Sequence, residues 1–146
     1  MFSFVIPSSG TNQTATLSGS ITIINPGDQW NNITIRYSPN AGMYPTELYM
    51  SPLSSHTIKL NSSALSVCKG WGLVSCPDDR ISISSLHVIS VMASSYSANE
   101  AGDSFLVMPI SMASTSYAVT LPEPSDDGSV FAYLLLAGVD EAQVDV

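Results

Sequence analysis

Hydrophobic residues occur along the chain in short runs of Val, Ile, Thr, Tyr and Phe, separated by Gly, Pro, Asn and Asp. Apolar and polar positions alternate within several runs, and no window keeps a 3.6-residue apolar period for long. A two-residue period places successive side chains on opposite faces of a strand, so the pattern predicts β-strands. The only helical candidate, residues 62–67, is a single turn at most.

The clearest pattern covers residues 18–37. An apolar stretch at 21–24 leads into Asn25-Pro26-Gly27-Asp28, and the chain resumes with alternating apolar residues at 33, 35 and 37. Two strands joined by a turn give this pattern, and we interpret it as a β-hairpin.

Further strands are expected at residues 2–6, 46–50, 56–60, 80–84, 87–94, 104–110, 117–121 and 130–137. In the strand 87–94, His87, Ile89 and Val91 would share one face, and Val88, Ser90 and Met92 the other. Both faces carry apolar residues, which predicts a central strand buried on both sides. The fold class expected is all-β, with antiparallel sheets packed as a sandwich or as blades and little or no helix.

A length of 146 residues suits one all-β domain, residues 1–146. Residues 4–35 faintly resemble residues 119–146, which suggests a segment of a larger repetitive extracellular protein, although chance similarity explains the resemblance as well. On the repeat interpretation, the apolar strand 130–137 pairs with the N-terminal strands and closes the domain.

Charge limits the partners. Four Lys and Arg against twelve Asp and Glu give a net charge of -8, which opposes binding to nucleic acid and to anionic membrane surfaces. The longest apolar run, residues 130–139, is half a bilayer span, so no membrane insertion is expected. The apolar run 2–6 is too short for a signal-peptide core, and the chain therefore shows no export signal of its own.

Other signals favour an oxidising, extracellular environment. Asn12, Asn32 and Asn61 each begin an N-glycosylation sequon. Cys68 and Cys76 lie close together among glycines, which suits a local disulfide, with two buried free thiols as the alternative. A single cysteine pair is too small a ligand set for zinc.

No catalytic, metal or cofactor residue is predicted. The chain has no Gly-x-Ser-x-Gly elbow, and His56 and His87 lie in alternating strand sequence, where a polar-face histidine is usually solvated. Two acidic turns, at residues 100–103 and 126–129, have oxygen ligands but match no calcium-loop spacing, so solvated turns are the expectation.

Aromatic residues in or beside predicted turns allow a carbohydrate-binding platform. Trp30, Trp71 and Tyr44 occupy such positions. An exposed aromatic ring can cover the apolar face of a sugar, whereas Trp71 can equally pack over a disulfide.

Residues 80–137 carry a series of short strand and turn motifs: Ile83-Ser84-Ser85, Ile89-Ser90-Val91, Asp103-Ser104-Phe105, Met108-Pro109 and Tyr117-Ala118-Val119. In these motifs the chain resembles the N-terminal domain of the IgGFc-binding protein family. Residues 20–37 are similar to the strand-turn-strand opening of that domain, and Phe2-Ser3-Phe4 to its aromatic start. One departure is residues 113–116, where many relatives place a Gly before the Tyr.

The resemblance implies a secreted, mucus- or matrix-associated module of larger proteins, and it assigns no binding role to a particular residue. The function expected is therefore a non-catalytic extracellular binding or structural module, with an extracellular protein or glycoprotein partner and no cofactor. The alternatives are a carbohydrate-binding module that uses Trp30 and Trp71, and a hydrolase with an unrecognised site.

Overall fold

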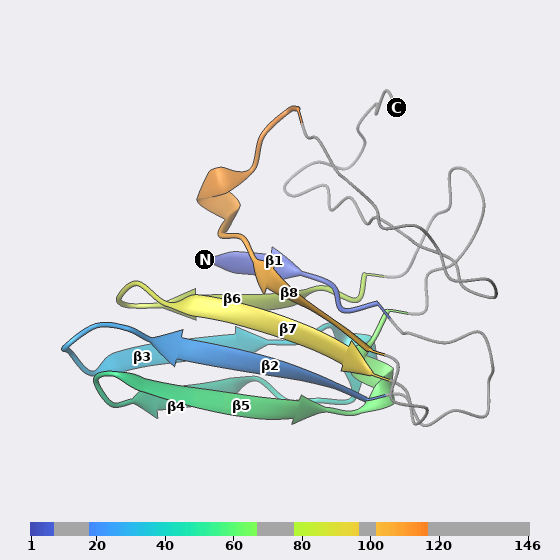
Figure 1. Ribbon diagram of the computed structural model, residues 1–146. Helices are drawn as coiled ribbons and strands as arrows, with labels where there is room; N and C mark the ends of the chain where they lie inside the picture. Colours follow the sequence, from blue (N-terminus) through green and yellow to red (C-terminus); the bar gives the residue numbers. More distant parts are fainter. Residues whose placement is uncertain (8–17, 67–77, 97–101, 117–146) are drawn as a thin grey trace. The chain divides into compact units, whose positions relative to one another are not determined.

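The computed structural model describes residues 1–7, 18–66, 78–96 and 102–116. Contacts divide the chain into two compact units, Met1–Met112 and Ala113–Val146. The strands of the described residues lie in the first unit, where they form two four-stranded antiparallel sheets (Figure 1). The predicted fold class, an all-β antiparallel sandwich with little helix, is confirmed.

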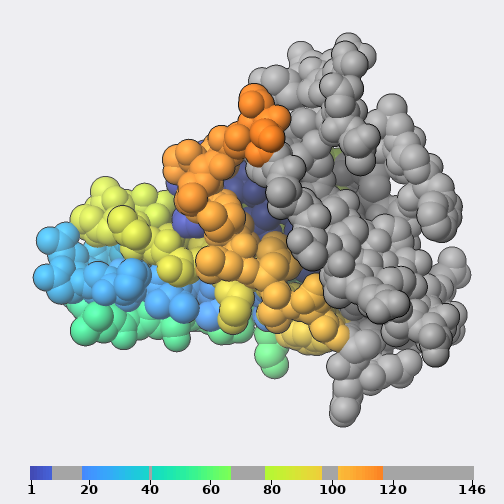
Figure 2. Space-filling model, turned by 45° about the horizontal axis from the view of Figure 1, so that its top comes forward, coloured from blue at the N-terminus to red at the C-terminus, as the bar shows by residue number. Residues whose placement is uncertain are grey.

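One sheet, called sheet I here, has the strand order β1-β6-β3-β4: β1 is Phe2–Phe4, β6 Ile81–Ser85, β3 Asn31–Arg36 and β4 Thr46–Met50. The other, sheet II, has the order β5-β2-β7-β8: β5 is Ser54–Leu60, β2 Ser18–Asn25, β7 Ser90–Tyr96 and β8 Gly102–Val107. Figure 2 shows the strands of sheet II from β5 in green, through β2 in blue and β7 in yellow, to β8 in orange. The described residues also contain three short 3₁₀ turns, each after a strand: η1 (Pro39–Ala41) after β3, η2 (Ser62–Ala64) after β5 and η3 (Ile110–Met112) after β8.

The core lies between the two sheets and consists mainly of β-branched side chains. The isoleucines at alternate positions of β2, β3 and β6 are fully buried: Ile21, Ile23, Ile33, Ile35, Ile81 and Ile83. Burying such a side chain stabilises the fold by about 1.5–3 kcal/mol. The polar residues between them face outward, which is the two-residue period on which the strand predictions rest.

The predicted hairpin at residues 18–37 is wrong. Its two strands form, but β2 pairs with β5 and β7, and β3 pairs with β4 and β6. Residues 26–30 therefore cross from one sheet to the other. The isoleucines of β2 and β3 face each other across the core, and a two-residue period is the same whether neighbouring strands lie side by side or face to face.

The strand predicted at 87–94 begins at Ser90 and, as expected, lies between two neighbours, β2 and β8. It is buried on one side only, contrary to the prediction. Ile89, Val91 and Ala93 face the core, whereas Val88 and Met92 are exposed. His87 is exposed in the bend before the strand and does not share the buried face of Ile89.

β1 has neighbours on both sides. Phe2 pairs with Ile83 of β6 and forms an isolated bridge with Pro109, and the Ile110 amide donates to the Met1 carbonyl oxygen at 3.0 Å. The chain therefore leaves β8 in sheet II and returns beside β1 in sheet I. This contact covers part of a sheet edge that would otherwise expose unpaired backbone groups.

The strands predicted at 117–121 and 130–137 lie outside the described residues, as does the C-terminal copy of the suggested repeat. Closure of the domain by residues 130–137, and the assignment of residues 1–146 to one domain, stay predictions.

Candidate binding site

Three connections cross between the sheets at the same end of the sandwich, on the left in Figure 1. They are residues 26–30 between β2 and β3, residues 51–53 between β4 and β5, and residues 86–89 between β6 and β7. We call them the first, second and third arches, and together the arch end. Loops held on a rigid scaffold are common binding sites, so this end is the natural place to look for one.

The fully buried side chain of Asn25 joins the first two arches. Its Nδ2 donates to the carbonyl oxygens of Gln29 and Ser51, both at 2.9 Å, and its Oδ1 accepts from the Gly27 amide at 3.4 Å. The Leu53 amide also donates to the Gly27 carbonyl oxygen at 3.0 Å. The first arch is therefore bonded to itself and to the second.

A second fully buried asparagine, Asn31, joins the first arch to the third. It is the first residue of β3, directly after the first arch, and holds the third arch to that strand: its Nδ2 donates to the His87 carbonyl oxygen at 3.2 Å, and its Oδ1 accepts from the His87 amide at 3.0 Å. The Ser85 hydroxyl donates to the same carbonyl oxygen at 2.8 Å. The Leu86 amide donates to the Asn32 carbonyl oxygen at 3.1 Å, which extends the contact between β6 and β3. Buried amides that satisfy backbone groups in this way fix a loop in one conformation.

The fixed arches carry exposed aliphatic side chains. Leu53 is 79 % exposed, Leu86 74 % and Val88 81 %. Leu53 has a φ of 50°, in the left-handed region, which costs a non-glycine residue about 1–2 kcal/mol. The second arch thus holds a large apolar side chain in water on a strained backbone.

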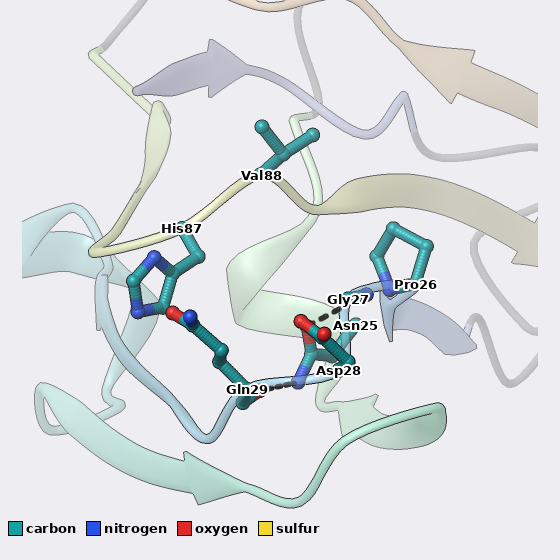
Figure 3. A pocket seen from close by; sticks show the side chains of 7 residues that line it. All are labelled: Asn25, Pro26, Gly27, Asp28, Gln29, His87 and Val88. Carbon is teal, nitrogen blue, oxygen red and sulfur yellow. Dashed lines mark hydrogen bonds between the residues drawn. The ribbon is translucent and has the colours of Figure 1, made fainter.

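Two open hollows flank the first arch. One, of about 300 Å³, is lined by residues 25–29 with His87 and Val88; in Figure 3 the His87 ring points toward Gln29, and Val88 points away from the first arch. The other, of about 370 Å³, is lined by residues 24–26 and 53–55. Hollows this shallow suit the side chains of a partner better than an enclosed small molecule.

At the arch end, the ring of Trp30, the last residue of the first arch, stacks on the Tyr49 ring on the outer face of sheet I. The ring centroids of Trp30 and Tyr49 lie 4.9 Å apart with an interplanar angle of 12°. Tyr49 is opposite Asn32 in the register of β3 and β4, and all three side chains are exposed. We call Trp30, Asn32 and Tyr49 the aromatic corner.

The other residues singled out from the sequence are scattered or lie outside the description. His56 is exposed on β5, far along the chain from His87, and Tyr44 is exposed in the β3–β4 connection. Asn61 is exposed before η2, and its Oδ1 lies 3.0 Å from the Ser63 hydroxyl. Outside the described residues are Asn12, Cys68, Trp71, Cys76, Glu100 and residues 126–129.

Arg80 and Asp78 form an ion pair just before β6. The Arg80 guanidinium binds the Asp78 carboxylate with two hydrogen bonds of 2.7 Å, and this contact lowers the pKa of the Asp78 carboxyl. Within the described part of the chain, no group of three or more His, Cys, Asp or Glu is placed to hold a metal ion.

Sequence reasoning treated Asn25 as a turn residue and gave Asn31 no role. Asn25 is the last residue of β2 and Asn31 the first of β3, and each continues the inward-facing positions of its strand, two residues from Ile23 and Ile33. An asparagine at the inward-facing position where a strand ends is a signal for a buried amide that binds loop backbone.

No protein-family model matches the chain, and neither a curated protein nor a solved structure matches it significantly. Among the described residues, no helix has the length and apolar character needed to cross a membrane.

Proposed function

We propose that the protein is a non-catalytic extracellular binding module that contacts a protein or glycoprotein partner through its arch end. One observation carries the proposal: three arches, joined by two buried asparagines, display Leu53, Leu86 and Val88 to solvent. The resemblance of residues 80–137 to the IgGFc-binding protein family supports a secreted binding module and names no partner for this chain.

Rigidity favours this use of the arches. A loop already fixed in its binding conformation loses little conformational entropy when a partner docks. Exposed apolar side chains at a rigid tip can enter pockets of the partner, and such anchors supply much of the energy of an interface. The hollows on both sides of the first arch can in turn receive side chains from the partner.

The backbone of Leu53 supports the same proposal. Glycine would fit a φ of 50° without strain, and an exposed leucine gains little from folding. Local strain of this kind is found where a side chain is used for function.

The test compares capture by the wild type with capture by a Leu53→Ser/Val88→Ser double variant. Immobilised protein is incubated with the native secretion, and the captured protein is identified by mass spectrometry, purified and titrated. We expect the dissociation constant of the double variant to rise about tenfold or more.

Tyr44→Ser is the matched control, because Tyr44 is 89 % exposed and lies in the β3–β4 connection at the opposite end of the sandwich. Its affinity should equal that of the wild type. Equal affinity of the Leu53→Ser/Val88→Ser variant, with an unchanged melting temperature, would remove the arch end from the interface.

A carbohydrate-binding module is the second candidate, and the stacked Trp30 and Tyr49 rings favour it. The other residue expected to contribute, Trp71, lies outside the described residues. Binding to a glycan array that Trp30→Ala abolishes, and that the Leu53→Ser/Val88→Ser variant retains, would support this candidate over the first.

A further inference from the structure

We propose that Asn32 carries an N-linked glycan whose first sugar, an N-acetylglucosamine, packs against the Trp30 and Tyr49 rings. The proposal rests on the extracellular part of the proposed function, because the modification requires passage through a glycosylating secretory pathway. It gives the aromatic corner an occupant that belongs to the chain itself.

The position of the sequon in the strand carries the argument. In the sequence Trp30-Asn31-Asn32-Ile33-Thr34, residues 30, 32 and 34 alternate with the inward-facing Asn31 and Ile33. Trp30, Asn32 and the sequon threonine therefore lie on the outer face of sheet I, about 7 Å apart along the strand. Tyr49 lies directly across from Asn32, where opposite Cβ atoms are about 5 Å apart.

At these spacings, a single sugar ring attached to Asn32 can reach both aromatic residues. Trp30 is 52 % exposed and Tyr49 71 %, so the stacked pair leaves a large apolar area in water. The C–H face of a pyranose can cover such an area while its hydroxyl and acetamido groups stay hydrated. The exposed Leu86, whose amide is bonded to the Asn32 carbonyl oxygen, adds apolar surface nearby.

Neither of the other two sequons has an aromatic residue two positions before its asparagine. The residue two positions before Asn61 is Lys59, and the residue two positions before Asn12 is Gly10. At Asn61 the sequon hydroxyl of Ser63 lies 2.7 Å from the Ala41 carbonyl oxygen and 3.0 Å from Asn61 Oδ1. Asn61 is therefore an internal control, a sequon without an aromatic residue two positions before it.

The chemical step is a glycosyl transfer from a polyprenyl-diphosphate-linked oligosaccharide, catalysed by the transferase of the host cell. A bond forms between Asn32 Nδ2 and the anomeric carbon of the first sugar. The bond between that carbon and the diphosphate oxygen breaks, and the lipid diphosphate leaves with its electron pair. The proton lost by Nδ2 passes to a base of the transferase and from there to solvent. Nothing is oxidised or reduced.

The experiment uses the full chain behind a secretion leader, expressed in cells that make only oligomannose glycans. Mass spectrometry of glycopeptides measures occupancy at each sequon. An endoglycosidase then trims every glycan to its first N-acetylglucosamine, and the melting temperature is compared with that of Asn32→Gln in backgrounds with Trp30 intact or replaced by alanine.

We expect Asn32 to be occupied and its single sugar to raise the melting temperature by about 3 °C when Trp30 is present. The increase should fall below about 1 °C with Trp30→Ala or Tyr49→Ser and should persist with Trp30→Phe. As the control, the difference in melting temperature between the trimmed protein and its Asn61→Gln variant should be the same with Trp30 and with Trp30→Ala.

Two outcomes overturn the proposal: an unoccupied Asn32, or an increase that is equal with and without Trp30. A third result, binding of a sugar that does not belong to the chain, would also overturn the proposal. If free N,N′-diacetylchitobiose shifts the Trp30 indole resonance equally in trimmed wild type and in Asn32→Gln, the corner is open to foreign sugars and not covered by the chain's own glycan. Failure of the glycan proposal would not affect the proposed arch-end interface, because that interface is tested at Leu53 and Val88.

Discussion

Asn31 and His87 are joined by two hydrogen bonds, from Asn31 Nδ2 to the His87 carbonyl oxygen at 3.2 Å and from the His87 amide to Asn31 Oδ1 at 3.0 Å. The side-chain amide thus makes the pair of bonds that a residue of a neighbouring antiparallel strand would make. The third arch is held to β3 as though the sheet continued for one more residue, although the chain at this point is crossing to sheet II.

Replacing Asn31 with alanine should destabilise the protein by about 1–3 kcal/mol, because the part-buried His87 amide loses its partner, whereas the His87 carbonyl oxygen keeps the hydrogen bond from the Ser85 hydroxyl. Urea denaturation of unglycosylated protein measures the change. The neighbouring Asn32→Ala is the control. We expect it to change the free energy of unfolding by less than about 0.5 kcal/mol, because Asn32 faces solvent. Equal effects of the two substitutions would show that the Asn31 contact contributes little to stability.

Leu53→Gly should leave stability unchanged or raise it by up to about 1 kcal/mol, since glycine relieves the strain of a φ of 50°. The opposite substitution, Gly42→Ala, should cost about 1 kcal/mol, because Gly42 has a φ of 61°. Thermal unfolding measures both. A large loss of stability in Leu53→Gly would mean that the leucine side chain holds the second arch in place and is not available to a partner.

Ile89→Asp and Val88→Asp separate the two faces of the segment before β7. Ile89 is buried, so a carboxylate there should cost several kcal/mol or prevent folding, whereas Val88 is exposed and its substitution should change stability by less than about 0.5 kcal/mol. Circular dichroism melts of the two variants provide the comparison. If both unfold the protein, a further layer covers Val88.

Stability should decrease in alkaline solution through Tyr37. Burial raises the pKa of the Tyr37 phenol, whose oxygen is buried and has no hydrogen-bond partner among the described residues, and the neighbouring Thr46 side chain offsets part of the rise. The folded protein then binds the phenolic proton more tightly than the unfolded chain, so this contribution is fully present below about pH 10 and is lost as the pH rises through the higher folded pKa.

Tyr37→Phe should flatten the decrease in the free energy of unfolding between about pH 9.5 and 11, and should leave stability near pH 7 unchanged or higher. Urea denaturation across this range is the measurement. An unaltered slope in the phenylalanine variant would assign the alkaline loss to other groups.

Much of the sandwich could be predicted from the sequence, because apolar and polar residues alternate along a strand that has one buried face. β4 was predicted with its observed bounds, and the single turn after β5 was anticipated. The alternation gives no information on pairing partners, so it predicts a hairpin for β2 and β3. For β7 the prediction of two buried faces rests on Val88 and Met92, which are apolar but exposed.

The candidate site was harder to predict. Trp30 was singled out as an aromatic platform, but its stacking partner Tyr49 lies nineteen residues along the chain and meets it only through the register of β3 and β4. Asn25 and Asn31 have the residue type of turns, and only the packing of three arches buries them. The position at a strand end marks each asparagine as a candidate buried amide, but the backbone groups that it binds depend on tertiary structure.

The return of the chain to β1 has a mechanical consequence. Residues 1 and 110 are joined by a backbone hydrogen bond, and Phe2 pairs with Pro109. A pulling force applied between residue 1 and residue 112 would therefore act first on this short contact and open the hydrogen bond and the bridge one after the other. The ladder between β1 and β6 would yield next, while the central strands of both sheets would bear load only after β1 had been peeled away. In a single-molecule stretching experiment, the sandwich would extend in a small early step before its main rupture.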